Sequence, residues 1–230
     1  MTIRDKPDVI LVGELHRADE FLKLQESDIV EFLDAIQFYE NQTKAHAWLI
    51  KKEKPRFVFL EYDECDLDAW NSCYKLLSAH PKFASEASDN GMDWNSYYHI
   101  AEKFVAADAV HAELVAMDEA FVREAVWKLE RTKKSGHLPI DEEFHYLTMP
   151  YREERWAHQM TKAIKSNRGH EVSDLAFLGD KHCSENSKLL ERLHEYEISY
   201  SVLHPYELIR RYDAYQGSWL TKLSRFLRPS

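Results

Sequence analysis

Cysteine, glycine and proline are all scarce in this chain of 230 residues, which has 3 Cys, 6 Gly and 7 Pro. Three cysteines are too few for the disulfide framework of a small secreted domain, so we expect a reducing, cytoplasmic environment. The low glycine and proline content excludes collagen-like and proline-rich disordered proteins. No apolar run is long enough to cross a membrane, and the first residues lack the apolar stretch of a signal peptide. We therefore expect no membrane span.

Basic charge is also limited. The chain carries 30 Lys and Arg against 40 Asp and Glu, a formal net charge of −10, and its only short basic run is Arg131-Thr132-Lys133-Lys134. Nucleic-acid phosphates are bound by clustered Lys and Arg, so no nucleic-acid partner is expected. The hydrophobic fraction of 44% is ordinary for a globular protein and supplies a full core. At this length we expect a single domain over residues 1–230.

Short apolar runs alternate with longer amphipathic stretches, which is typical of an α/β fold. The pattern predicts a mainly parallel central sheet flanked by helices, because nearly continuous apolar strands suit a sheet covered on both faces. Segment 79–134 is predicted to be a helical insertion or lid, and the chain ends in a helical tail. The expected strands are 8–12, 56–61, 111–117, 175–178 and 198–203. The expected helices are 26–54, 66–79, 95–107, 120–134, 141–166 (bent near Pro150), 184–195 and 205–227 (interrupted at Gly217).

One eight-residue pattern occurs twice, at residues 9–16 and 175–182: four apolar residues, Gly, an acid, any residue and His. In a parallel sheet, ligands bind beyond the carboxyl ends of the strands. If the two strands are neighbours, His16 and His182 therefore meet at one edge although they are far apart in the sequence. The glycines allow a tight turn and close approach of the backbone at that edge.

The residues at these strand ends can support two kinds of chemistry. Two imidazoles and a carboxylate form a plausible divalent-metal site, and Glu61, which ends another strand, is the natural third partner. The same groups could instead hold a water molecule for general-base attack. Glu14 could ligate, orient an imidazole or cap a helix, and the same alternatives apply to Asp180. Asp118 ends a third strand and could face the same cleft.

These motifs resemble a superfamily that unites the TraB/PrgY proteins, the Tiki proteases, the erythromycin esterases and the ChaN-like haem-binding proteins. The resemblance rests on Gly13–His16, on Gly179–His182 and on the strand that ends at Glu61. It also includes a helix motif at residues 151–157, in which Arg152 and Arg155 compete for the family's arginine and Trp156 replaces a methionine. The chain departs from the family at Asp180-Lys181, where small residues usually stand between Gly and His.

The resemblance implies a hydrolase-like site that cleaves an ester or an amide (peptide) bond. It implies catalytic roles for Glu14, His16, Glu61, Arg152 and His182, with a divalent metal (Mn, Zn, Co or Fe) held by His16, Glu61 and His182 or with water activated directly. Arg152 would then stabilise the developing oxyanion. The ChaN branch implies the alternative, a protein that binds haem or another small ligand without hydrolysis. The partner is accordingly a small molecule or a peptide.

Some residues near the motifs are ambiguous. Cys183 follows His182, and a nucleophilic cysteine needs a lowered pKa and a nearby base. Glu153 follows Arg152 as an orienting partner, and His204 ends the last expected strand. The tail from Ser218 has apolar residues at helical spacing, which pack either on the same domain or on a second copy in a homodimer.

Overall fold

The computed structural model describes residues 6–15, 29–79, 94–120, 122, 124, 149–166 and 172–226. His16 lies outside these residues, as do most of the helix predicted at 120–134 and the first part of the one predicted at 141–166. Within the described chain, no helix is long and apolar enough to cross a membrane.

A parallel sheet of five strands forms the centre of the described structure, in the order β3-β2-β4-β1-β5. The predicted α/β class with a parallel central sheet is confirmed. All six residues of β4 are buried, as expected for an inner strand covered on both faces. The strands are β1 (Val9–Glu14), β2 (Phe57–Leu60), β3 (Glu113–Ala116), β4 (Asp174–Gly179) and β5 (Tyr200–Leu203).

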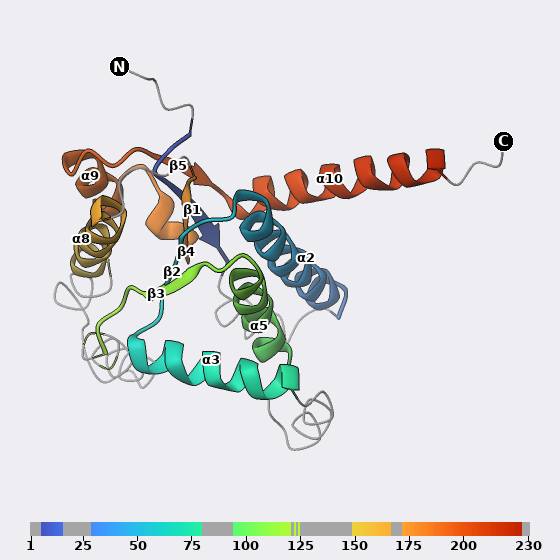
Figure 1. The fold of residues 1–230 in the computed structure, drawn as a ribbon, viewed down its shortest axis with the longest axis horizontal. Helices are drawn as coiled ribbons and strands as arrows, with labels where there is room; N and C mark the ends of the chain where they lie inside the picture. The colour runs from blue at the N-terminus through green and yellow to red at the C-terminus, as the bar shows by residue number, and fades with distance from the viewer. Residues whose placement is uncertain are drawn as a thin grey trace.

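Helices cover both faces of the sheet (Figure 1). In that view, α8 and α9 lie on one side, and α2, α5 and α10 lie on the other, where α10 projects away from the sheet. The helices are α2 (Ile29–Glu53), α3 (Glu64–Ala79), α5 (Trp94–Ala109), α8 (Pro150–Ser166), α9 (Lys188–Glu195) and α10 (Pro205–Phe226), and a 3₁₀ turn, η1 (Asp180–Cys183), follows β4 directly.

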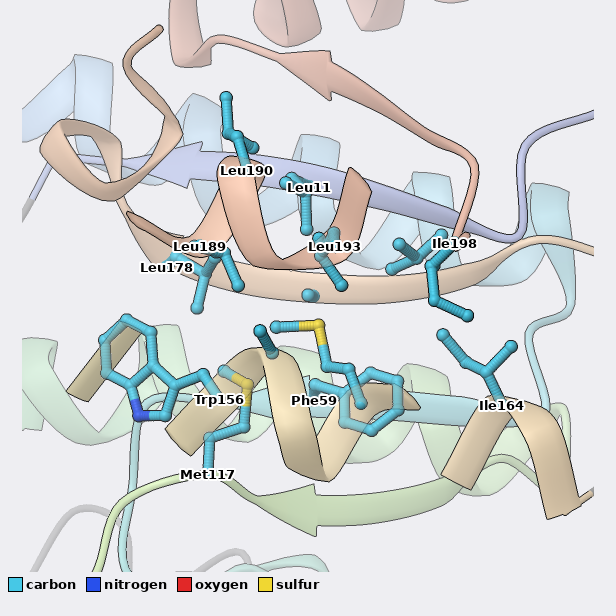
Figure 2. Close-up of a cluster of buried hydrophobic side chains, with 14 of the residues drawn as sticks. Leu11, Phe59, Met117, Trp156, Ile164, Leu178, Leu189, Leu190, Leu193 and Ile198 are labelled. Atoms are coloured by element: carbon cyan, nitrogen blue, oxygen red, sulfur yellow. The ribbon is translucent and has the colours of Figure 1, made fainter. Parts of the chain in front are cut away.

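Alternate side chains of each strand enter two separate hydrophobic clusters, because successive residues of a strand point to opposite faces. Leu11 and Phe59 pack with α8 and α9, where Trp156 is fully buried (Figure 2). Val12 and Val58 pack on the opposite face with α2, α5 and the start of α10. The sheet is therefore the middle layer of three.

The amino edge of the sheet is fixed by a buried carboxylate. Asp174, at the start of β4, accepts hydrogen bonds from the backbone N–H groups of Arg56 (3.1 Å) and Phe57 (3.0 Å). The Arg56 guanidinium adds an ion pair of 2.6 Å. These bonds hold the starts of β2 and β4 together and leave the opposite, carboxyl edge for the candidate site.

Two local predictions are corrected. The tail helix was expected to break at Gly217, but α10 runs through it from Pro205 to Phe226, since one glycine costs only about 1 kcal/mol in a helix. The expected helix over 141–166 was to bend near Pro150. Instead Met149 lies in a turn and α8 begins at Pro150. Proline suits the first helical position because that residue's N–H would have no partner within the helix.

Segment 79–134, expected to be an insertion or lid, contributes directly to the described layers. Its strand β3 pairs with β2 in the central sheet. Its helix α5 packs against α2 and α3. The structure describes residues 79, 94–120, 122 and 124 of this segment, so the assignment of an insertion and of one domain over 1–230 stays a prediction.

Candidate functional site

A buried carboxylate holds the histidine of the second motif. His182 lies in η1, directly after β4, and its Nδ1 is 2.7 Å from Oε1 of Glu153, in the first turn of α8. The other Glu153 oxygen accepts a hydrogen bond of 2.7 Å from the backbone N–H of Lys188. Both side chains are nearly buried, at 7% and 3% exposure. The orientation of the imidazole is therefore fixed from the Nδ1 side.

The second ring nitrogen of His182 remains available. Among the residues that the structure describes, Nε2 has no hydrogen-bond partner, and it is not one of their fully buried unpaired atoms. The His182 side chain is 7% exposed. Trp156 packs edge-on against the imidazole, with ring centroids 4.7 Å apart. This arrangement presents one imidazole nitrogen to a ligand while the other is bound by a carboxylate.

Arg152 lies at the centre of an ion-pair network beside this pair. Its guanidinium donates to Glu61 at 2.5 Å and to both oxygens of Asp118 at 3.0 and 2.7 Å. Asp118 also accepts from the indole N–H of Trp156 at 2.9 Å. The second Glu61 oxygen accepts from the backbone N–H of Gly179 at 3.0 Å. The ends of β2, β3 and β4 are thus joined to α8 through one arginine.

The network keeps Arg152 charged. Burial acts to lower the pKa of this guanidinium, but the Glu61 and Asp118 carboxylates outweigh it and raise the pKa above its ordinary value. The predicted oxyanion role needs a guanidinium that faces the substrate. In the structure Arg152 instead neutralises two carboxylates, and its plane also covers the Trp156 ring at 4.7 Å.

Glu14, at the end of β1, belongs to a different set of contacts. Its carboxylate forms a close ion pair with Lys103 of α5. His46 of α2 lies 3.3 Å from the same oxygen but makes no hydrogen bond, and both of its ring nitrogens are buried and unpaired. Burial lowers the pKa of His46 to about 3, with a further contribution from Lys103 that Glu14 opposes in part. His46 is therefore neutral at physiological pH.

Gly13 of β1 and Asp180, which follows β4, lie against each other at the carboxyl edge of the sheet. β1 and β4 are adjacent and parallel, which fulfils the condition for the two motifs to meet, and Glu14 is paired in register with Gly179. A Cβ on Gly13 would lie 2.0 Å from Oδ1 of Asp180, so only glycine fits there with Asp180 in place. The same oxygen lies 2.7 Å from Nδ1 of His204.

Cys183 lacks the properties of a nucleophile. Its side chain is buried. Burial raises the pKa of its thiol to about 12, and the carboxylates of Asp180, Glu14 and others add to the rise. A nucleophilic cysteine requires the opposite shift, so the thiol stays protonated and unreactive at neutral pH.

Of the predicted site residues, the structure brings Glu61, Arg152 and Asp118 into direct contact and places His182 beside them through Trp156. Glu14 contacts Lys103 instead. The described residues contain no group of three His, Cys, Asp or Glu arranged to hold a metal ion. Because His16 is outside them, the metal set of His16, Glu61 and His182 stays a prediction.

Sequence reasoning missed several contacts. Glu153 was expected to orient Arg152, but it binds His182. Consecutive residues of a helix point in different directions, so Glu153 faces a different group from Arg152. That spacing was the only signal in the sequence that Glu153 has a partner of its own. The roles of Lys103 and His46 had no signal, since neither lies at a strand end.

Comparisons with known proteins identify no family. No protein-family model matches the chain, and no curated protein matches it either. Among solved structures, one described as "Cofacial heme binding to ChaN of Campylobacter jejuni" aligns with 86% of this chain and 81% of its own. The identity is 14% and the TM-score is 0.37. A likeness this weak assigns neither a function nor a ligand to the present chain.

Proposed function

We propose that the carboxyl edge of the sheet binds a small ligand and that Nε2 of His182 is the atom that meets it. The observation that supports this is the 2.7 Å contact between His182 Nδ1 and Glu153, together with the absence of a partner for Nε2 in the described chain. Ligand-binding histidines commonly have one ring nitrogen held by a carboxylate, which fixes the tautomer and makes the other nitrogen more basic.

Haem is the first candidate ligand. His182 would hold the haem iron through Nε2, because its imidazole is already oriented by a carboxylate, as in histidines that bind metals. The predicted partners for a bare metal ion are less free, because Glu61 already binds Arg152 and the N–H of Gly179. Bound haem would supply iron-centred binding or redox chemistry, while Glu153 would hold the imidazole in place.

Absorbance on titration with haemin tests this candidate. His182→Gln is the informative variant, because it keeps a polar side chain of similar length but lacks the basic imidazole nitrogen. His204→Gln is the matched control, since His204 also has a carboxylate 2.7 Å from Nδ1 but is 53% exposed. We expect a Soret band with the unmodified protein and with His204→Gln, and a much weaker one with His182→Gln. An unchanged spectrum in His182→Gln would exclude His182 as the ligand.

Hydrolysis is the second candidate, and the same pair of residues favours it. Nε2 could accept a proton from a water molecule while that water attacks an ester or amide carbonyl, and Glu153 would stabilise the resulting imidazolium. The proton would then pass from Nε2 to the leaving oxygen or nitrogen. The residues predicted for this reaction are Glu14, His16, Glu61, Arg152 and His182, with or without a divalent metal on His16, Glu61 and His182. Arg152 would act indirectly, by holding Glu61 in place.

Release of p-nitrophenol from p-nitrophenyl acetate and butyrate tests this second candidate, with a peptide amide series in parallel. The protein is assayed after metal removal and again with Mn²⁺, Zn²⁺, Co²⁺ or Fe²⁺. We expect turnover that His182→Gln abolishes and His204→Gln retains. Turnover that survives in His182→Gln, or none with any ester or amide, counts against hydrolysis and leaves the haem titration unaffected.

A further inference from the structure

A second site, a groove whose lining does not include His182, has the residue composition of a small-molecule site. It lies among α2, α5 and α10 and has a volume of about 770 Å³. Ligand pockets commonly measure about 300–1,000 Å³, so the size suits a ligand of several fused or linked rings. Its lining reaches the surface, since Tyr215 is 47% exposed.

Aromatic rings form the wall of the groove. Trp48 contacts two tyrosines of α10, with its ring centroid 6.1 Å from that of Tyr212 and 5.6 Å from that of Tyr215. The hydroxyl of Tyr212 accepts a hydrogen bond of 2.8 Å from Gln216, which fixes that ring. Flat apolar surfaces of this kind stack on planar ligands, and neighbouring rings prefer tilted or offset contacts.

Three lysines of α2 also line the groove, Lys44, Lys51 and Lys52, with Glu102 of α5 as the acidic lining residue. Glu40 and Glu53 lie 3.7 Å and 3.4 Å from Lys44 and Lys52 and neutralise part of this positive charge. Lys52 Nζ also lies 5.0 Å from the Trp48 ring centroid. These lysines share a helix face with Trp48, because residues three or four apart on a helix are neighbours. A basic patch over aromatic rings is unexpected on a chain with a net charge of −10.

We infer that this groove binds a planar aromatic anion, meaning a flat ring system that carries a carboxylate, sulfonate or phosphate group. The rings of Trp48 and Tyr215 would contact the flat faces of the ligand, and Lys51 and its neighbours would attract the acidic group. The site is separate from the one proposed at His182, because the described residues that line it do not include His182 or Glu153.

Fluorescence titration with 8-anilinonaphthalene-1-sulfonate, an aromatic anion that brightens in apolar sites, tests the inference. Lys51→Glu reverses one exposed charge of the groove, and Tyr215→Ser removes part of its wall. Lys165→Glu, which reverses an exposed charge of α8, is the matched charge control. We expect Lys51→Glu to weaken dye binding about fivefold at low salt and less at high salt, because salt screens exposed charges. Lys165→Glu should leave binding unchanged, and each variant should melt at the temperature of the unmodified protein.

The uncharged analogue N-phenyl-1-naphthylamine separates charge recognition from simple apolar binding. We expect Tyr215→Ser to weaken both dyes and Lys51→Glu to weaken only the sulfonate. Equal binding of the sulfonate dye to Lys51→Glu and the unmodified protein would overturn the inference, as would no binding at all. His182→Gln should bind the dye normally. Haemin could also bind in the groove instead of at His182. In that case haemin would displace the dye, and its Soret band would be lost in Lys51→Glu and retained in His182→Gln. This result would support the groove and show that the proposal of haem binding at His182 is wrong.

Discussion

His182 Nδ1 lies 2.7 Å from Oε1 of Glu153, although the two residues come from different elements, η1 and α8. The contact fixes the imidazole from one side, and the backbone N–H of Lys188 in turn fixes Glu153. The position of the other ring nitrogen, Nε2, therefore depends on how α8 packs on the sheet. Trp156, fully buried in the α8 core, contacts the same ring and supports it.

Replacing Glu153 with Gln should lower the affinity for haemin at His182, with a smaller effect on the free energy of unfolding. The amide can still contact Nδ1, but it does not make Nε2 more basic. Loss of such a supporting carboxylate typically costs about 10- to 100-fold in metal affinity or activity. Haemin affinity is the measurement, with Glu154→Gln as control, since Glu154 forms a half-buried ion pair with Arg192 instead of contacting His182. Equal haemin affinities for the two variants would contradict this role.

Replacing Arg152 with Met should strongly destabilise the protein. It would leave Glu61 and Asp118, both mostly buried, without their guanidinium partner. Removing one member of a buried ion pair costs about 3–5 kcal/mol of unfolding free energy. Arg155→Met is the control, because Arg155 is 44% exposed in its pair with Glu119. An exposed pair contributes about 0–1 kcal/mol, so urea unfolding should distinguish the two variants clearly.

Replacing Gly13 with Ala should break the contact between Asp180 and His204. The new Cβ would occupy the position of Asp180 Oδ1, so that side chain must move. We expect a loss of about 1–3 kcal/mol, the usual cost of overpacking. In a background of Asp180→Ala the same substitution should cost much less. A double-mutant cycle measured by thermal unfolding checks this, and additive losses would show that another contact is responsible.

The buried His46 should make the protein less stable in mild acid. Its pKa is about 3 in the folded state against 6.5 for the unperturbed group. The unfolded chain therefore binds a proton first, and stability is lost as the pH falls below 6.5, by up to about 1.4 kcal/mol per pH unit. Urea unfolding at a series of pH values, compared with His46→Leu, measures this. The variant should show a shallower loss between about pH 6.5 and about pH 5.

Cys183 should resist alkylation while Cys65 reacts. The thiol of Cys183 is buried with its pKa raised to about 12, whereas Cys65 is exposed. Iodoacetamide labelling followed by peptide mass spectrometry reports each site separately. Labelling of Cys183 should require denaturant, and rapid labelling of the folded protein would show that this part of η1 opens readily.

The fold could be predicted in most respects because hydrophobic pattern alone determines it. The apolar run at 175–178 has no polar residue, and it became the fully buried inner strand β4. Local details were less predictable. Pro150 begins α8, and Gly217 stays within α10. Proline is favoured at the first position of a helix, and one glycine costs a helix only about 1 kcal/mol, so neither residue by itself marks where a helix bends or breaks.

The candidate site was predictable only where residues end strands. Glu61, Asp118 and His182 follow strands of one parallel sheet, so their placement at one edge follows from topology. Their pairing does not. Whether Arg152 meets a substrate or a carboxylate, and whether Glu153 serves Arg152 or His182, depends on the rotation of α8 about its axis. That rotation is set by the burial of Trp156 and Met160, which single-sequence patterns specify only approximately.

The most direct test of the account is thermal unfolding of the metal-stripped protein with haemin and with each divalent cation, beside His182→Gln and His204→Gln. A ligand that binds only the folded state raises the melting temperature by mass action. The account predicts that at least one of these ligands stabilises the unmodified protein and His204→Gln but not His182→Gln. Equal stabilisation of all three proteins by every ligand that binds would contradict the central role of His182.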